Sequence, residues 1–171
     1  MSAGDSAALL RVENLSVTFE TAKGRIEAVR GISFTLGRER LGIVGESGSG
    51  KSTVGRCLTR LIDPDGGRVM IGGADIALMS GAELRDKRRQ LQMIFQDPFS
   101  SLNPRARVSR ILTEGLIAYG TGRAQAMERA RELLGLVGLD PSAMHRFPHE
   151  FSGGQRQRIG IARALALEPS I

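Results

Sequence analysis

Between residues 9 and 36, apolar and polar positions alternate with the period of two that is typical of β-strands. The alternation is clearest over residues 9–19, and a Thr-Ala-Lys-Gly turn signal at 21–24 predicts that the chain then reverses into a second strand. A short continuous apolar run follows at 41–44, the pattern of a strand buried on both faces. The sequence therefore predicts strands over residues 9–19, 26–36, 40–44, 68–71 and 91–95.

Helical spacing appears between and after these strands. One helix is expected to begin near Lys51 and to stop at the Asp-Pro-Asp-Gly-Gly run at 63–67. Ser80 and Glu83 match a capping box, which predicts a charged helix over residues 80–90. Later helices are predicted from the apolar sets Ile111, Leu112, Leu116 and Ile117, and Met127, Ala130, Leu133, Leu134 and Val137, with helix starts at Asp140 and Ser152. A strand-built beginning and a helical second half predict two lobes within one domain.

The sequence Gly-Glu-Ser-Gly-Ser-Gly-Lys-Ser at 45–52 lies between a predicted strand and a predicted helix, and it fits the phosphate-binding pattern Gly-x-x-x-x-Gly-Lys-Ser. Glycines let backbone N–H groups converge on an anion, and the following helix start favours negative charge. Lys51 would reach the β- and γ-phosphates, and the Ser52 hydroxyl would hold Mg²⁺. The alternative is a glycine-rich turn that happens to precede a lysine. The candidate nucleotide-binding residues are Gly45, Glu46, Ser47, Gly48, Ser49, Gly50, Lys51, Ser52 and Thr53.

A second glycine-containing helix start follows Phe151. Ser152 is a good N-cap, and Gly153 and Gly154 expose backbone N–H groups, so the stretch that continues to Gln155 is a second potential anion site. Helix starts with glycine are common, and the residues alone leave both interpretations open.

Composition limits the class of protein. The 171 residues are 41% hydrophobic and 25% charged, which suits one globular domain. The net charge of +6 raises the hypothesis that the protein binds nucleic acid. The chain has one tyrosine and no tryptophan to stack on bases, so the basic clusters at 85–89 and 123–131 are better explained as solvated helix faces. The single Cys57 cannot form an internal disulfide. Residues 1–8 are expected to be flexible. They lack the pattern of a signal peptide, which predicts that the protein is located in the cytoplasm.

With these motifs in order, the sequence resembles the ATP-binding cassette (ABC) family, the nucleotide-binding subunits of transporters. Residues 45–52 match its Walker A loop, residues 151–155 its signature motif with Phe151 in place of the commoner leucine, and Gln96 its Q-loop. Residues 95–104 resemble the branch that powers dipeptide and oligopeptide import, whose relatives also take up nickel or glutathione.

The resemblance implies an α/β fold, a P-loop NTPase of the ABC type with a strand-rich N-terminal part, a central mixed sheet and an α-helical subdomain. Residues 9–96 and 152–171 would form the ATP-binding core, and residues 97–151 the mainly helical subdomain. ATP and Mg²⁺ are the implied cofactors.

The resemblance also implies roles for single residues. Phe19 would stack on adenine, although a core aromatic at a strand end is the alternative. Lys51 and the loop N–H groups would bind phosphates, while Ser52 and Gln96 would meet Mg²⁺. Gln96 would also link the γ-phosphate to the membrane subunit.

Partners are implied in the same way. Ser152, Gly153, Gly154 and Gln155 would close on ATP held by a second ABC subunit, identical or homologous, in a head-to-tail dimer. The region from Gln96 to Arg105 would contact membrane permease subunits, and an extracytoplasmic solute-binding protein would act indirectly. The subunit would be peripheral, at the cytoplasmic face of the membrane, with no nucleic acid partner.

The chain stops where the family has the Walker B strand, its catalytic glutamate and a later histidine. Glu46 and Glu150 do not fall at the place of that catalytic base, and His145 and His149 lack metal-ligand spacing. The chain is therefore expected to be an incomplete record that binds nucleotide but hydrolyses it poorly, with residues 41–44 as an unpaired strand edge. Two rivals remain: a cassette that acts on nucleic acid or ribosomes, and an ATP-binding module without turnover.

Overall fold

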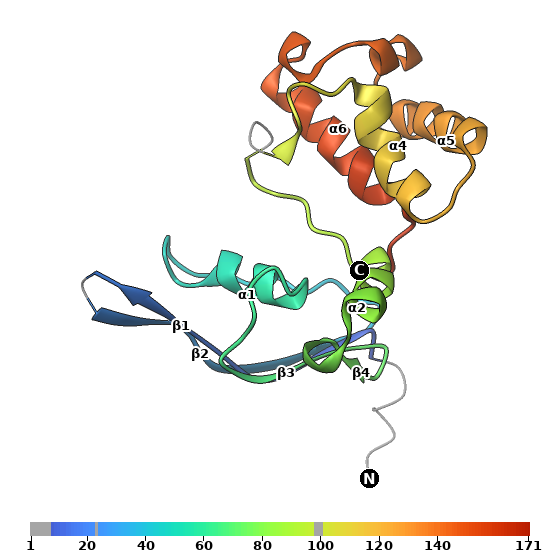
Figure 1. The fold of residues 1–171 in the computed structure, drawn as a ribbon. Helices are drawn as coiled ribbons and strands as arrows, with labels where there is room; N and C mark the ends of the chain where they lie inside the picture. The colour runs from blue at the N-terminus through green and yellow to red at the C-terminus, as the bar shows by residue number, and fades with distance from the viewer. Residues whose placement is uncertain (1–7, 23, 98–100) are drawn as a thin grey trace. The chain divides into compact units, whose positions relative to one another are not determined.

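The computed structural model describes residues 8–22, 24–97 and 101–171, and the described chain divides into two units. The first unit holds residues up to Leu91 together with Ser170 and Ile171, and the second holds residues 92–169. Figure 1 shows the strands in the first unit and most of the helices in the second. Each unit has its own cluster of buried apolar residues, so each is described by itself.

The first unit is built on an antiparallel sheet with strand order β2-β1-β3-β4. Two long strands, β1 (Leu10–Thr21) and β2 (Gly24–Leu36), form a hairpin, and β3 (Gly66–Ile71) pairs with the other edge of β1. The short β4 (Ala74–Asp75) completes the sheet. The alternating pattern of residues 9–19 thus predicted β1 correctly, since Leu10, Val12, Leu15 and Val17 are all buried.

Helix α1 (Lys51–Leu58) packs with this sheet through Val54 and Cys57, which are buried with the apolar residues of β1 and β3. A 3₁₀ turn, η1 (Ile76–Leu78), and helix α2 (Gly81–Gln90) follow. The capping box predicted for α2 is confirmed: the Ser80 N–H donates to Glu83 Oε2 at 2.8 Å, and the Glu83 N–H donates to Ser80 Oγ at 3.4 Å.

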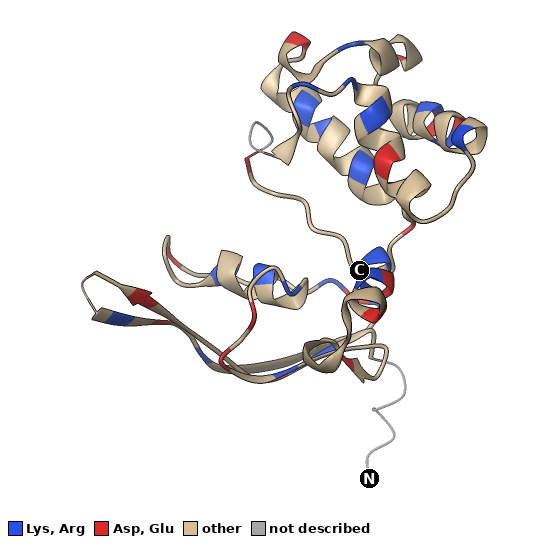
Figure 2. Ribbon diagram, viewed as in Figure 1, with Lys and Arg blue, Asp and Glu red and all other residues tan. Residues whose placement is uncertain are grey.

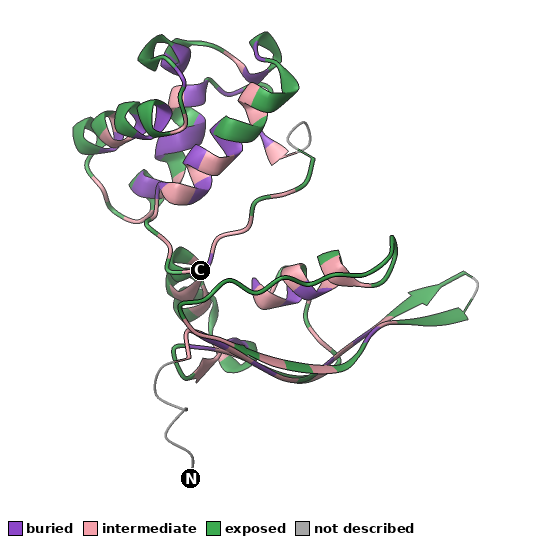
Figure 3. Ribbon diagram, turned by 180° about the vertical axis from the view of Figure 1, so that it is seen from behind, coloured by how far each residue is buried: buried purple, intermediate pink, exposed green. Residues whose placement is uncertain are grey.

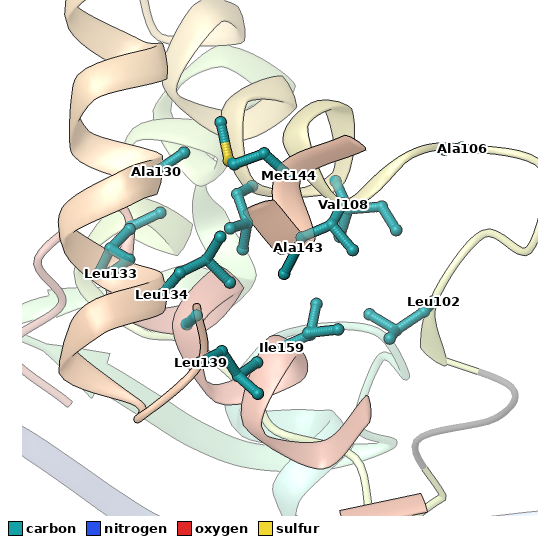
Figure 4. Packing of buried hydrophobic residues seen from close by; sticks show 14 of the residues in the cluster. Leu102, Ala106, Val108, Ala130, Leu133, Leu134, Leu139, Ala143, Met144 and Ile159 are labelled. Carbon is teal, nitrogen blue, oxygen red and sulfur yellow. The ribbon is translucent and has the colours of Figure 1, made fainter. Parts of the chain in front are cut away.

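The second unit is helical, with α4 (Val108–Ala118), α5 (Arg123–Leu136), the 3₁₀ turns η2 (Pro141–His145) and η3 (Pro148–Glu150), and α6 (Gly153–Leu165). Figure 4 shows apolar side chains from α5, η2 and α6 converging on one core. Leu134, Met144 and Ile159 lie at its centre with at most 2% of their surface exposed. In Figure 3 the buried colour follows the inner sides of these helices. The apolar spacing noted in the sequence therefore predicted the buried faces, except that Ile117 is 45% exposed.

Two predicted strands are wrong. Residues 40–44 and 91–95 run without a strand ladder in the structure. Val44 is 94% exposed, although Leu91 itself is buried. A β-strand forms only where its backbone makes hydrogen bonds with an adjacent strand. Neither segment belongs to the sheet formed by the described residues, so neither is a strand. For the same reason the sheet is antiparallel throughout rather than the expected mixed sheet.

Helix α6 packs with α4 and α5, since Ile159 and Ala162 belong to the core of the helical unit. The assignment of residues 152–171 to an ATP-binding core, with residues 97–151 as a separate subdomain, stays a prediction. Among the described residues, no helix combines the length and the apolar character needed to cross a bilayer.

Candidate functional site

The glycine-rich loop at 45–50 curls around the ammonium group of Lys51, the first residue of α1. Lys51 Nζ donates to the carbonyl oxygens of Gly45 at 2.8 Å and Glu46 at 2.6 Å, and to Ser49 Oγ at 3.2 Å. The Ser49 N–H closes the loop by donating to the Glu46 carbonyl oxygen at 3.2 Å. The loop therefore has the curled shape that a phosphate cradle requires, with its cation at the centre.

The last glycine of the loop fixes how α1 begins. Gly50 is the N-cap, with φ of +89°, a conformation that side chains disfavour. A Cβ at this position would clash with the Ala28 carbonyl oxygen of β2, so the loop approaches the sheet more closely than any other residue would allow. No side chain caps α1, and its first turn holds no acidic residue. The exposed N–H groups of this turn can therefore receive an anion.

Two cavities lie beside β2, and one of them adjoins the loop. The first has a volume of about 450 Å³ and is lined by Val44, Gly48, Ser49 and Lys51 of the loop region and by residues 27–30 and Ile32 of β2, among others. The second, of about 480 Å³, is lined by Thr18, Arg25, Ile26, Glu27 and Arg30. Glu27 and Arg30 of β2 line both cavities.

The predicted nucleotide-binding residues form the loop and the first turn of α1. They are Gly45, Glu46, Ser47, Gly48, Ser49, Gly50, Lys51, Ser52 and Thr53. The Ser52 side chain is exposed in the first turn of α1. Phe19 lies on β1 opposite Ile26 and is 39% exposed, and it lines neither of the two cavities.

Gln96 is exposed and belongs to the helical unit rather than to the unit of the loop. It ends the extended stretch that follows α2. The predicted partner-sensing loop, from Asp97 to Arg105, includes residues 98–100, which lie outside the described residues. The contact of Gln96 with Mg²⁺ therefore stays a prediction.

The second predicted anion site also has the expected local form. Ser152 is the N-cap of α6: its Oγ accepts from the Gln155 N–H at 3.3 Å, and its own N–H donates to Gln155 Oε1 at 3.0 Å. Gly153 and Gly154 follow it and are exposed. Ser152 and Gln155 thus form a capping box at the start of a 13-residue helix.

The segment just before Ser152 contains contacts that the sequence analysis missed. The guanidinium carbon of Arg146 lies 4.3 Å from the centroid of the Phe151 ring, and the Arg146 Nε lies 3.6 Å from Glu150 Oε1. The sequence analysis treated Glu150 only as an acid that is not the catalytic base. The replacement of the usual leucine by Phe151 was the one available signal, because an aromatic ring can accept a cation where leucine cannot.

Other charged and titratable groups do not form a catalytic centre. Burial raises the pKa of the Cys57 thiol to about 11, which makes it inert, and no cluster of metal-ligating side chains occurs among residues 8–22, 24–97 and 101–171. On α5, where Figure 2 shows both signs of charge, Arg129 pairs with Glu132 at 2.9 Å and Arg131 with Glu128 at 2.7 Å. Arg131 is thus paired on the exposed surface, whereas Arg129 is about one-third exposed and also pairs with Glu168 at 3.2 Å.

Comparison with known proteins identifies the family. A family model described as "ABC transporter" matches residues 29–171, so the chain belongs to the ABC transporter family. This confirms the resemblance drawn from the Walker A and signature motifs and the α/β fold class of the ABC type.

Several similar proteins carry names from peptide uptake. The chain is 52% identical over 163 residues to a protein of Brucella ovis provisionally named a peptide import ATP-binding protein, 49% identical to the dipeptide transport ATP-binding protein DppF of Lactococcus lactis, and 47% identical to the oligopeptide transport ATP-binding protein OppF of Bacillus subtilis. Each match covers 94% of this chain and 51%, 54% and 54% of the relative. The chain therefore spans about half the length of the curated relatives it matches.

Solved structures agree on the fold. A dimeric post-hydrolysis structure of the ATP-binding cassette MJ0796, bound to ADP and Pi, matches with a TM-score of 0.84 and 30% identity over 94% of this chain and 70% of that one. A further match, cbiO1 from Clostridium perfringens, which is part of the ABC transporter complex cbiONQ, has a TM-score of 0.76 and 26% identity over 95% of this chain and 63% of that one.

Proposed function

We propose that this chain is the ATP-binding part of a subunit that couples ATP binding and hydrolysis to the import of peptides or related small solutes through a membrane permease. The observation that carries the proposal is the loop at 45–50, which holds the Lys51 ammonium at the uncapped start of α1. The printed names of the relatives from Lactococcus lactis and Bacillus subtilis support the peptide branch.

Phosphate binding follows from the chemistry of the loop. Lys51 Nζ has three oxygen partners, two carbonyls and one hydroxyl, at 2.6–3.2 Å. Phosphate oxygens carry more negative charge than these groups and make stronger hydrogen bonds to an ammonium. The N–H groups from Gly48 to Thr53 would add the anion attraction of a helix N-terminus. Lys51 would then leave its loop partners for the β- and γ-phosphates.

The donors proposed for Mg²⁺ fit that ion, because Mg²⁺ prefers oxygen ligands and retains several waters. Ser52 presents an exposed hydroxyl next to Lys51 in the first turn of α1. Gln96 would supply an amide oxygen. When bound, Mg²⁺ would neutralise charge on the terminal phosphates, while Lys51 and the loop N–H groups orient them.

Phe19 is proposed to stack on adenine. Phe19 is 39% exposed on β1, and its neighbours Thr18 and Ile26 line a cavity that shares Glu27 and Arg30 with the cavity at the phosphate loop. An exposed aromatic ring can cover one face of a base.

The remaining proposals concern assembly. Ser152, Gly153, Gly154 and Gln155 would bind the ATP of a second ABC subunit, identical or homologous, in a head-to-tail dimer. The region from Gln96 to Arg105 would contact the permease, and a solute-binding protein would act through the permease. The subunit would sit at the cytoplasmic face of the membrane, without a nucleic acid partner.

The nucleotide proposal is tested by titrating MgATP into the chain and measuring the heat of binding. Lys51→Ala should weaken binding about 100-fold, because a hydrogen bond to a charged group contributes about 3 kcal/mol. Lys87→Ala removes another lysine, from α2, and should leave the affinity within about twofold. Equal affinities in the Lys51→Ala variant and the unaltered chain would reject the site, provided that circular dichroism shows both folded.

The transport proposal needs the full-length protein in its cell. A strain that carries Lys51→Ala should lose uptake of labelled di- and oligopeptides, whereas Lys87→Ala should retain it. If both strains take up peptides equally and the purified chain still binds MgATP, then nucleotide binding stands and peptide import is the wrong process.

A further inference from the structure

A buried aromatic residue immediately precedes the signature turn, which consists of residues 152–155 at the start of α6. Phe151 is 4% exposed and belongs to the apolar core of the helical unit, and the next residue, Ser152, is the N-cap of α6. Since consecutive residues share a peptide plane, any movement of the Phe151 backbone is transmitted directly to the cap. The packing of this ring therefore determines where the signature turn begins.

Arg146 covers this ring. Its guanidinium carbon lies 4.3 Å from the ring centroid, within the range of a cation–π contact. Arg146 itself is anchored at both ends. Its carbonyl oxygen accepts from the N–H of Val108, the first residue of α4, at 3.0 Å, while its side chain donates to the Glu150 carbonyl oxygen and lies 3.6 Å from the Glu150 carboxylate.

Glu150 connects this arginine to the turn that leads to the signature. Its Oε2 accepts from the Phe147 N–H at 2.5 Å, and this bond is the main reason why the pKa of Glu150 lies below its ordinary value. The carboxylate is therefore charged at neutral pH and can hold the Arg146 guanidinium in place. A chain of contacts thus runs from α4 through Arg146 and Glu150 to Phe151.

The signature helix closes the same segment from the other side. Arg156, one turn after Ser152, donates from Nε to the Pro148 carbonyl oxygen at 2.8 Å, and its N–H donates to the Ser152 carbonyl oxygen at 2.9 Å. The turn is held by its own helix and, through Arg146, by a different helix.

We propose that Arg146 is a positioning residue for the signature turn: by lying over the Phe151 ring it fixes the backbone at Ser152 and preorganises the N–H groups of Gly153 and Gly154 for an anion. The interaction requires an aromatic residue, because a leucine side chain offers no π face to a cation. The functional consequence rests on the proposed role of the signature in binding the nucleotide of a second subunit.

The test is a double-mutant cycle of Arg146→Ala and Phe151→Leu, followed by amide hydrogen exchange in the absence of nucleotide. The reporters are the N–H groups of Gln155 and Arg156, whose partners are the side-chain and main-chain oxygens of Ser152. With Phe151 present, Arg146→Ala should speed exchange at both amides about tenfold, the effect of a cation–π contact of about 1.4 kcal/mol. With Leu at position 151, the same substitution should change exchange by only about two- to threefold, because only the contacts of Arg146 with Glu150 are then lost.

Arg107→Ala is the matched control. Arg107 also lies over an aromatic ring, 5.5 Å from the centroid of Phe147, but that ring is not adjacent to the cap. It should leave exchange at the two amides unchanged. Three results would overturn the proposal: unchanged exchange in Arg146→Ala, an equal effect in the Phe and Leu backgrounds, or an increase spread evenly over α4, α5 and α6, which would indicate a general stabilising role.

A second readout separates this proposal from the proposed function. Arg146→Ala should raise several-fold the MgATP concentration that half-saturates chain–chain association, measured by sedimentation, while the MgATP affinity of the single chain stays the same. If the unaltered chain binds MgATP but never associates, the proposed trans role of the signature fails, and the exchange data still decide whether Arg146 positions the turn.

Discussion

Arg88 on α2 donates from Nη2 to the main-chain oxygen of Arg60 at 2.7 Å, so the side chain of one helix closes the end of another. Its Nε also donates to the Thr59 carbonyl oxygen at 2.9 Å. These oxygens follow the last turn of α1, where unpaired carbonyls and the helix dipole favour a cation. Because α1 begins at Lys51, Arg88 holds the far end of the helix that starts at the proposed phosphate site.

Arg88→Ala should lower the free energy of unfolding of the strand-rich unit by about 2 kcal/mol, since two carbonyl oxygens lose a charged donor. Urea denaturation followed by circular dichroism measures this. Arg85→Ala removes an exposed arginine from the same helix and serves as the control, with an expected change within about 0.5 kcal/mol. Similar losses in the two variants would show that Arg88 does not stabilise the end of α1.

Local rules predicted much of this molecule. The capping box at Ser80, the N-cap at Ser152 and the loop before Lys51 depend on residues within a few positions of one another, so the sequence contains all the partners they need. The same holds for the apolar faces of α4 and α5.

The parts that could not be predicted depend on distant partners. Residues 40–44 and 91–95 have the composition of buried strands, but a ladder needs a neighbour, and the sequence pattern does not say which one. Arg88 lies 28 positions from Arg60, and nothing in the spacing links them. Arg146 over Phe151 is closer in sequence, yet it depends on a tertiary turn that composition does not indicate. Side-chain contacts that depend on the tertiary arrangement of the chain were thus the main omission.

The loop conformation gives a separate prediction at Gly50. Gly50→Ala should destabilise the strand-rich unit by at least about 1–2 kcal/mol, the cost of placing a side chain in the left-handed region, and contact with the Ala28 carbonyl oxygen should add to it. MgATP binding should be lost with it. Gly81→Ala, at the first position of α2, meets no atom within 4 Å and should be neutral or slightly stabilising. Thermal melts of both variants, with MgATP titrations, make the comparison, and normal binding by Gly50→Ala would contradict the proposed geometry.

Stability should depend on acid pH through Glu83. The backbone N–H of Ser80, and then its side chain, donate to the Glu83 carboxylate and lower its pKa below the ordinary value of 4.5. A carboxyl group whose pKa is lower in the folded state stabilises the fold above the unfolded-state pKa, and that stabilisation is lost as the pH falls through the folded-state value. Glu83→Ala should therefore be less stable than the unaltered chain at pH 7, and the difference should shrink steadily below about pH 4.5. Glu83→Gln, which keeps an acceptor but cannot titrate, is the control. A difference that is constant between pH 7 and pH 3 would contradict this origin.

Arg163 gives the last prediction, because it connects the signature helix to the segment that follows the predicted Q-loop. It lies on α6, and its Nη1 donates to the Ser101 carbonyl oxygen at 2.5 Å. Burial lowers the pKa of this guanidinium, but an arginine keeps its charge at neutral pH. Its removal would take a charged donor from the Ser101 carbonyl oxygen in a partly buried place. Arg163→Ala should therefore destabilise the helical unit by about 2–3 kcal/mol, whereas Arg163→Lys, which keeps the charge, should lose less.

The control is Arg110→Ala, on the exposed face of α4, with an expected change within about 0.5 kcal/mol. Hydrogen exchange can show where the loss occurs: Arg163→Ala should speed exchange in residues 101–106 more than in α5, because Ser101 and not α5 loses its partner. Equal acceleration in both places would mean that Arg163 supports the whole helical core. Acceleration confined to residues 101–106 would make it the residue that holds the proposed permease-contacting segment on the signature helix.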